Sequence, residues 1–280
     1  MGKGATELVD LLVLIGMGAV LPLGLALIDE PGLARIRRLW PLAAVPGVLS
    51  LWLPRGALAA GPAVVYALGT LVLALHAPLR LARTRSLAPA EVAVLTALAA
   101  PSVAGVALVA ERSGYPLFGF EPHVLALTVP HFHYAGFTAA LVSGLVCRAD
   151  RGSRPARCAA LSVPAGTLLV LAGYFLGNWW QFAGAVVLST GMWLVGLVSW
   201  RELRPRARDR ATARLFAVSS AILALTMLLA LWWALGRAAG LPHPTLTWMA
   251  ATHGLGNALG FALCALLAWR RITTTVETPR

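Results

Sequence analysis

Residues 215–235 read LFAVSSAILALTMLLALWWAL, a run of 21 residues without a charged side chain. A bilayer-spanning α-helix needs roughly 20 consecutive apolar residues. Similar runs recur along the whole chain of 280 residues, separated by short breaks rich in arginine, proline or glycine. The pattern therefore predicts an all-α, polytopic bundle of transmembrane helices that forms a single domain, residues 1–280.

The composition is typical of a membrane protein. Hydrophobic residues make up 59% of the chain and charged residues 12%, with a mean hydropathy of +0.77. Soluble domains carry about 25% charged residues, so the charge content excludes an ordinary soluble protein. Hydropathy predicts about nine spans, which are residues 8–28, 39–53, 57–78, 91–110, 123–146, 158–177, 179–200, 215–235 and 247–269.

Basic residues are distributed unevenly between alternate breaks. With nine spans, 19 of the 23 Lys and Arg residues fall on one side, and the remaining four, Lys3, Arg55, Arg112 and Arg237, fall on the other. Short loops rich in Lys and Arg stay in the cytoplasm. We therefore expect a multi-pass protein of the bacterial cytoplasmic (inner) membrane, with its N-terminus outside and its C-terminus inside. The net charge of +12 then faces anionic lipid and predicts no nucleic-acid partner.

The positions of the spans also indicate an internal repeat. Adding 124 to the residue numbers of the second to fifth spans gives the positions of the sixth to ninth, and His133 then falls opposite Asn257. The sequence favours a 1+4+4 arrangement, in which a first helix, 8–28, precedes two parallel halves, 39–146 and 158–269. Parallel repeats related by an axis along the membrane normal occur in several transporter folds.

Polar side chains inside two apolar spans mark the candidate site. The fifth span contains His131, His133 and Tyr134, and the ninth contains His253 and Asn257. A polar group in hydrocarbon costs several kcal/mol without a partner, so such residues usually face the protein interior or an aqueous cavity. At about 1.5 Å per residue, they lie at a similar depth in the outer half of the bilayer. We predict that they form one pocket that binds a substrate or carries out catalysis.

The local geometry of these residues leaves alternatives open. His131 and His133 are two positions apart, which is about 200° of rotation on a regular helix, so both rings cannot face one point. Pro130 removes a backbone donor and can kink or bulge the helix, which would bring both rings inward. The polar groups could instead hydrogen-bond across helices and hold the two halves together.

Other polar residues give weaker signals. Asp10, near the start of the first span, is a further candidate for substrate binding. Glu111 and Glu121 bracket an outer loop that could form a lid, and His123 is expected at the membrane interface. Two or three histidines would suit Zn, Cu or haem iron, but H-x-H on a helix is a poor bidentate ligand. We therefore predict no metal ligands and leave the cofactor open.

The string HFHYAGF at residues 131–137, followed by HGLGNALGF at residues 253–261, resembles the YndJ-like family of bacterial integral membrane proteins. Members are similar in pairing a histidine-tyrosine motif with a later HG-x-x-N-x-x-GF motif, and they are often labelled transporter-like. The resemblance implies no substrate. It implies that His131, His133, Tyr134, His253 and Asn257 are the site residues.

Transport or export of a small or lipophilic molecule is the leading functional hypothesis, because two pseudo-equivalent halves can rock about a shared site. The alternative is an intramembrane isomerase or cyclase that acts on a lipid or isoprenoid. In it, His131 or His253 would act as acid or base, and Tyr134 or Asn257 would stabilise developing charge. A metal- or haem-binding protein is the third hypothesis. The lipid bilayer is the expected partner, and the oligomeric state stays open.

Overall fold

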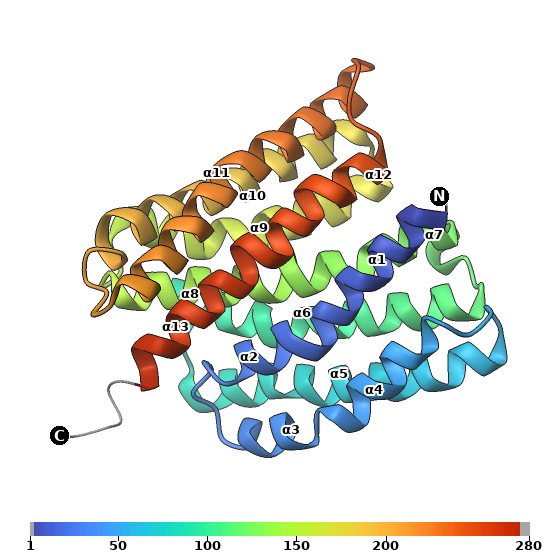
Figure 1. The fold of residues 1–280 in the computed structure, drawn as a ribbon, viewed down its shortest axis with the longest axis horizontal. Coiled ribbons are helices and arrows are strands. Elements are labelled where there is room, and N and C mark those ends of the chain that lie inside the picture. The colour runs from blue at the N-terminus through green and yellow to red at the C-terminus, as the bar shows by residue number, and fades with distance from the viewer. Residues whose placement is uncertain (1–2, 275–280) are drawn as a thin grey trace. The chain divides into compact units, whose positions relative to one another are not determined.

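The computed structural model describes residues 3–274, and within this range it consists of helices and turns without a β-strand (Figure 1). The predicted all-α, polytopic fold is therefore confirmed. Seven helices of the described part are long and apolar enough to cross a membrane, and they are Gly4–Leu25, Ala57–Thr84, Pro89–Ser113, Arg154–Leu176, Asn178–Leu203, Arg210–Ala239 and Leu246–Ile272.

The two other predicted spans are helical but differ from these seven. The span predicted at 39–53 contains the short helix α4 (Pro41–Ser50), preceded by α3 (Leu33–Leu39). The 10 residues of α4 rise only about 15 Å, half the thickness of the hydrocarbon core. The span predicted at 123–146 is a helical run from Pro122 to Ala149, which is long enough but carries more polar side chains. The number of spans and the orientation stay predictions.

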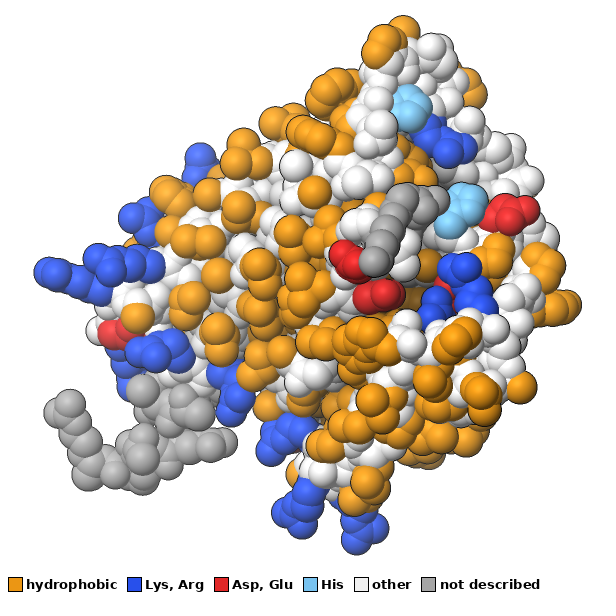
Figure 2. Space-filling view, turned by 45° about the vertical axis from the view of Figure 1, so that its right-hand side comes forward, with side chains coloured by type: hydrophobic (Ala, Val, Ile, Leu, Met, Phe, Trp, Pro, Cys, Tyr) orange, Lys and Arg blue, Asp and Glu red, His pale blue; other side chains and the backbone are white. Residues whose placement is uncertain are grey.

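Apolar side chains cover much of the face drawn in Figure 2. Leu42, Leu58, Leu79 and Leu168 are each more than half exposed. Soluble proteins rarely expose contiguous apolar patches larger than a few hundred Å², whereas helices in a bilayer contact lipid through such side chains. The lipid bilayer is therefore a partner of this chain.

The first compact unit comprises Met1–Ser86 and Leu95–Thr138. In it, helix α4 packs along α5, α1 along α7, and the π-helical segment η1 against the π-helical segment η3. Small residues allow close approach, since an added Cβ at Gly47 would lie 2.8 Å from the Cβ of Tyr66. The bounds of its further elements are α1 (Lys3–Ile15), η1 (Gly16–Val20), α2 (Leu21–Leu25), α5 (Ala57–Thr84), α6 (Pro89–Ser113, which begins in the second unit), η2 (Leu117–Gly119), α7 (Pro122–His131) and η3 (Phe132–Thr138).

The second compact unit comprises Leu87–Val94 and Ala139–Arg280. Helices α9 and α10 form a hairpin that turns at Gly177, whose φ of 117° favours glycine, and α10 packs against α11. The bounds of its elements are α8 (Ala139–Ala149), α9 (Arg154–Leu176), α10 (Asn178–Val198), η4 (Ser199–Leu203), α11 (Arg210–Ala239), α12 (Leu246–Met249), η5 (Ala250–Gly254), η6 (Gly256–Leu263) and α13 (Cys264–Thr274).

Asp209 begins the longest helix of the second unit as its N-cap. Its carboxylate accepts hydrogen bonds from the Thr212 backbone N–H at 3.0 Å and from the Thr212 hydroxyl at 2.7 Å. These two hydrogen bonds hold the pKa of Asp209 below its usual value. Arg271 of α13 also contacts this carboxylate at 3.2 Å, so the start of α11 and the C-terminal helix are joined at this end of the unit.

Candidate functional site

The helix that carries His131 and His133 is irregular, which is one of the two arrangements that Pro130 left open. Helix α7 ends at His131, and Phe132–Thr138 form the π-helix η3. His131 is exposed, whereas His133 is completely buried. The irregularity therefore does not bring both rings to the same surroundings.

His133 is fixed by tight contacts inside the first unit. Its Nε2 lies 2.6 Å from the Tyr66 hydroxyl, and an added Cβ at Gly16 would lie 2.4 Å from its Nδ1. In the part of the chain that the structure describes, Nδ1 has no hydrogen-bond partner. If Tyr66 donates to Nε2, the neutral ring carries its proton on Nδ1; with the other tautomer, the Tyr66 hydroxyl proton lacks an acceptor. Either way one buried donor is unpaired, which costs about 1–3 kcal/mol.

The first helix offers two carbonyl groups to aromatic side chains on either side of the start of η1. The Tyr134 hydroxyl donates to the Leu12 carbonyl at 2.7 Å, and Trp40 Nε1 donates to the Met17 carbonyl at 2.8 Å. The irregular π-helical turn shifts the usual backbone pairing, so carbonyl oxygens are accessible to these donors. The Tyr134 hydroxyl is thus used in holding the first helix.

In the second unit, His253 and Asn257 form a closed network with Thr226 of α11. His253 Nδ1 donates to the Thr226 carbonyl at 2.8 Å, and Asn257 Nδ2 donates to His253 Nε2 at 3.2 Å. The Thr226 hydroxyl lies 2.9 Å from Asn257 Oδ1 and 2.9 Å from the Ile222 carbonyl of its own helix, and these two acceptors share its one proton. Both ring nitrogens of His253 are therefore occupied, and the network connects α11 to the helix that ends the chain.

Replacing Asn257 with alanine is expected to lower the free energy of unfolding by about 1–3 kcal/mol, because His253 Nε2 loses its donor in a partly buried position. The measurement is unfolding in mixed detergent micelles, followed by tryptophan fluorescence. The control is Thr252→Ala, since the Thr252 hydroxyl bonds only the Trp248 carbonyl one turn earlier in its own helix. Its expected effect is within about 0.5 kcal/mol. Equal stability of the two variants would contradict an interhelical role of Asn257.

The predicted site residues thus form two groups. His133 and Tyr134 bond partners in the first unit, and His253 and Asn257 bond a partner in the second. Each group uses its polar atoms on its own unit, apart from His133 Nδ1. A single pocket that contains both groups stays a prediction.

A cavity of about 350 Å³ lies in the first unit. It is bounded by the beginnings of α1 and α7, the end of α6 and the turn after α4, all on the predicted outer side of the membrane. Its wall includes the apolar side chains Val9, Val13, Leu108 and Val129. Its polar lining residues are Thr6, Asp10, Arg55, Glu111, Arg112, Glu121 and His123. Figure 2 shows acidic and basic side chains close together on an otherwise largely apolar face.

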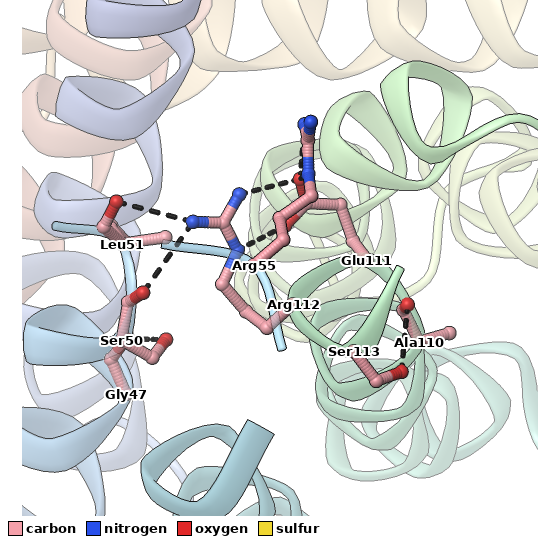
Figure 3. Close-up of polar contacts among 8 residues, drawn as sticks. All are labelled: Gly47, Ser50, Leu51, Arg55, Ala110, Glu111, Arg112 and Ser113. Atoms are coloured by element: carbon pink, nitrogen blue, oxygen red, sulfur yellow. Dashed lines mark hydrogen bonds and ion pairs between the residues drawn. The ribbon is translucent and has the colours of Figure 1, made fainter. Parts of the chain in front are cut away.

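Glu111 lies between two arginines at this cavity (Figure 3). Arg55 contacts Glu111 Oε1 through Nε at 2.9 Å and through a terminal nitrogen at 2.7 Å. Arg112 pairs with both carboxylate oxygens of Glu111, and it also donates to the Leu51 carbonyl at 3.2 Å and the Ser50 carbonyl at 3.4 Å. The Glu111 and Arg112 side chains are 2% and 7% exposed, and that of Arg55 is 50% exposed. Arg112 therefore ties the end of α6 to the end of α4, and Arg55 keeps one face open.

Two carboxylates of the cavity carry no such pairing. Among the described residues, neither Asp10 nor Glu121 has a hydrogen bond or an ion pair from its side chain, and Asp10 is partly buried while Glu121 is exposed. Arg112, Glu111, Arg55 and Glu7 act electrostatically on Asp10. Sequence reasoning considered Asp10 and Glu111 separately and missed Arg55 and Arg112. The signal was present, since these two arginines are among the four basic residues predicted outside.

The described residues contain no group of three or more His, Cys, Asp or Glu side chains placed to hold a metal ion. The polar clusters above combine one or more His, Asp or Glu side chains with arginine, tyrosine, threonine or asparagine. Their contacts are hydrogen bonds and ion pairs.

Comparisons with known proteins agree with the membrane character of the chain. A family model described as YndJ-like protein matches residues 11–261. The chain is 27% identical over 232 residues to a Bacillus subtilis (strain 168) protein described as "Uncharacterized membrane protein YndJ", a match that covers 82% of this chain and 41% of the relative. The chain thus spans about two fifths of the length of that relative. No solved structure matches the chain. Because the family model covers nearly all of the predicted spans, the chain belongs to the YndJ-like family.

Proposed function

We propose that this membrane protein transports or exports a small molecule, which it binds in the outer cavity of the first unit. The observation that carries the proposal is the cavity itself, about 350 Å³ in volume, with an apolar wall and charged side chains of both signs. Ligand pockets have volumes of about 300–1,000 Å³ and combine an apolar lining with a few placed polar groups. The predicted parallel repeat supports transport over a purely structural role.

The proposed binding residues differ from those that the sequence predicted. Asp10 and the group Arg55, Glu111 and Arg112 line the cavity. The hydroxyl of Tyr134 and both ring nitrogens of His253 are used in helix contacts. In this proposal, His133, Tyr134, His253 and Asn257 hold helices together, and Asp10 is the predicted binding residue that contacts the solute.

The test is uptake into proteoliposomes that contain the full chain. The solutes are glycine, 4-aminobutanoate, butylammonium, butyrate, glycerol and glucose, each measured by counterflow. The variant Ala126→Trp fills the cavity from its wall and is expected to lower uptake of the transported solute at least about tenfold, since a filled pocket excludes its ligand. The control Ala57→Trp adds the same side chain at an exposed position outside the cavity lining and should leave uptake unchanged.

Two results would overturn the proposal. One is a folded Ala126→Trp variant that transports as well as the unchanged chain. The other is the absence of both uptake and binding for all six solutes. Melting of each variant in detergent, followed by tryptophan fluorescence, separates loss of uptake from loss of folding.

A further inference from the structure

We infer that the solute is a small zwitterion, with an N–H-bearing ammonium group at Asp10 and an anionic group at Arg55. The inference rests on the proposed function, because it names the class of molecule that the outer cavity binds. It follows from how the charges of the cavity are already paired.

Asp10 supplies the position for the ammonium group. It lies on α1 between apolar residues, lines the cavity and is partly buried, and its carboxylate has no hydrogen bond or ion pair among the described residues. A partly desolvated carboxylate without a partner is costly. A bound ammonium group would supply both the missing charge and the missing donors.

Arg55 supplies the position for the anionic group. Glu111 carries one negative charge and is shared by two arginines, so this group of three retains one positive charge. Arg112 is nearly buried and uses its nitrogens on Glu111 and on the Ser50 and Leu51 carbonyls. Arg55 is half exposed and uses only Nε and one terminal nitrogen on Glu111. Its second terminal nitrogen is therefore available to a carboxylate or a similar anion.

The other residues that line the cavity restrict the class of solute further. None of the described residues that line the cavity is Phe, Tyr or Trp, whereas quaternary ammonium groups are typically bound in aromatic cages. An ammonium group that donates hydrogen bonds fits Asp10 better. The apolar side chains Val9, Val13 and Leu108 suit a short methylene chain between the two charged groups.

The first experiment compares four probes on the purified full chain by isothermal titration calorimetry. They are 4-aminobutanoate, its N-trimethyl derivative, butylammonium and butyrate. The zwitterion is expected to bind at least about tenfold more tightly than butylammonium or butyrate, because butyrate leaves Asp10 without a counter-charge and butylammonium leaves Arg55 without one. It is also expected to bind more tightly than its N-trimethyl derivative.

The second experiment tests which residue binds each end of the ligand. Asp10→Asn should lower the affinity for 4-aminobutanoate to that for butyrate and leave butyrate binding unchanged. Arg55→Gln should lower it to that for butylammonium, and the Glu111–Arg112 pair remains to hold the fold. The control is Asp29→Asn, an exposed carboxylate in the turn after α2 and outside the cavity lining. It should change affinity less than about twofold, since exposed charges are screened.

The outcomes separate this inference from the proposed function. Butylammonium binding as tightly as 4-aminobutanoate would overturn it in favour of a cation site, and equally tight butyrate binding would overturn it in favour of an anion site. A third outcome is that glycerol or glucose binds or is taken up, that Ala126→Trp abolishes this, and that none of the four charged probes binds. This outcome would rule out a zwitterionic solute but would still support the proposed transport function. If no solute of either set binds, the proposed function fails as well.

Discussion

Replacing Glu111 with glutamine is expected to lower the free energy of unfolding by about 3–5 kcal/mol. The Glu111 and Arg112 side chains are almost completely buried, at 2% and 7% exposed, so their charges compensate each other out of water. Glutamine keeps the size of the side chain but removes the negative charge. The Arg112 guanidinium then keeps the Ser50 and Leu51 carbonyls and one amide oxygen as acceptors but has no counter-charge, while Arg55 can turn to solvent. The measurement is unfolding in mixed detergent micelles, followed by tryptophan fluorescence.

Two further variants test whether charge burial is the cause. Glu121→Gln removes an exposed carboxylate from the same cavity and should change stability by no more than about 0.5 kcal/mol. The double variant Glu111→Leu with Arg112→Met removes both buried charges, and it should be more stable than Glu111→Gln alone, because neither buried charge is left without its counter-charge. If Glu111→Gln is as stable as Glu121→Gln, burial of the Glu111–Arg112 ion pair is not what stabilises this part of the fold.

The fold could be predicted from the sequence because a membrane span is a local property. A run such as 215–235 has the length and apolarity of a span wherever it packs, and it lies within the helix Arg210–Ala239. The prediction was least accurate where contacts with distant parts of the chain determine the length of a helix. The helix predicted at 39–53 is only Pro41–Ser50, and its final carbonyls are bonded by Arg112 from a distant part of the chain. No local pattern contains that contact.

The candidate site was predicted less completely, for a related reason. Polar residues in apolar spans were expected to face the protein interior or an aqueous cavity, and His133, Tyr134 and Asn257 are buried. His131 is exposed, because it lies two positions from the buried His133, which is about 200° of rotation on a regular helix, and the π-helix that begins at Phe132 does not bring the two rings together. Pro130 indicated that the helix could be irregular but not which side chains would then face the interior.

The cavity could not be predicted as a unit, because its charged residues come from separate parts of the chain. Asp10, Arg55, Glu111 and Arg112 are brought together by α1, the turn after α4 and the end of α6. The sequence gives their predicted side of the membrane, which is the same for all four. Which carboxylate pairs with which arginine depends on packing, and it is this pairing that leaves Asp10 without a partner.

Replacing Gly173 with alanine is expected to lower the free energy of unfolding by about 3 kcal/mol, at the upper end of overpacking effects. Helices α9 and α10 approach closely at glycines, as is common between membrane helices. An added Cβ at Gly173 would lie 2.4 Å from the backbone nitrogen of Gln181, and one at Gly184 would lie 2.5 Å from the backbone nitrogen of Val170. Because these contacts are with backbone atoms, a side-chain rotation cannot relieve them and the two helices must separate.

The matched control is Gly61→Ala in α5, where an added Cβ meets nothing within 4 Å. This variant should be neutral or more stable by about 0.5–1 kcal/mol, because alanine restricts the unfolded chain more than glycine does. Thermal melting in detergent measures both variants. The melting temperature should fall for Gly173→Ala and should stay unchanged or rise for Gly61→Ala. Because Gly173 lies in the second unit and the cavity in the first, a folded Gly173→Ala protein should retain the solute affinity of the unchanged chain. Melting of Gly173→Ala at or above the temperature of Gly61→Ala would show that the α9–α10 hairpin is not closely packed at this point.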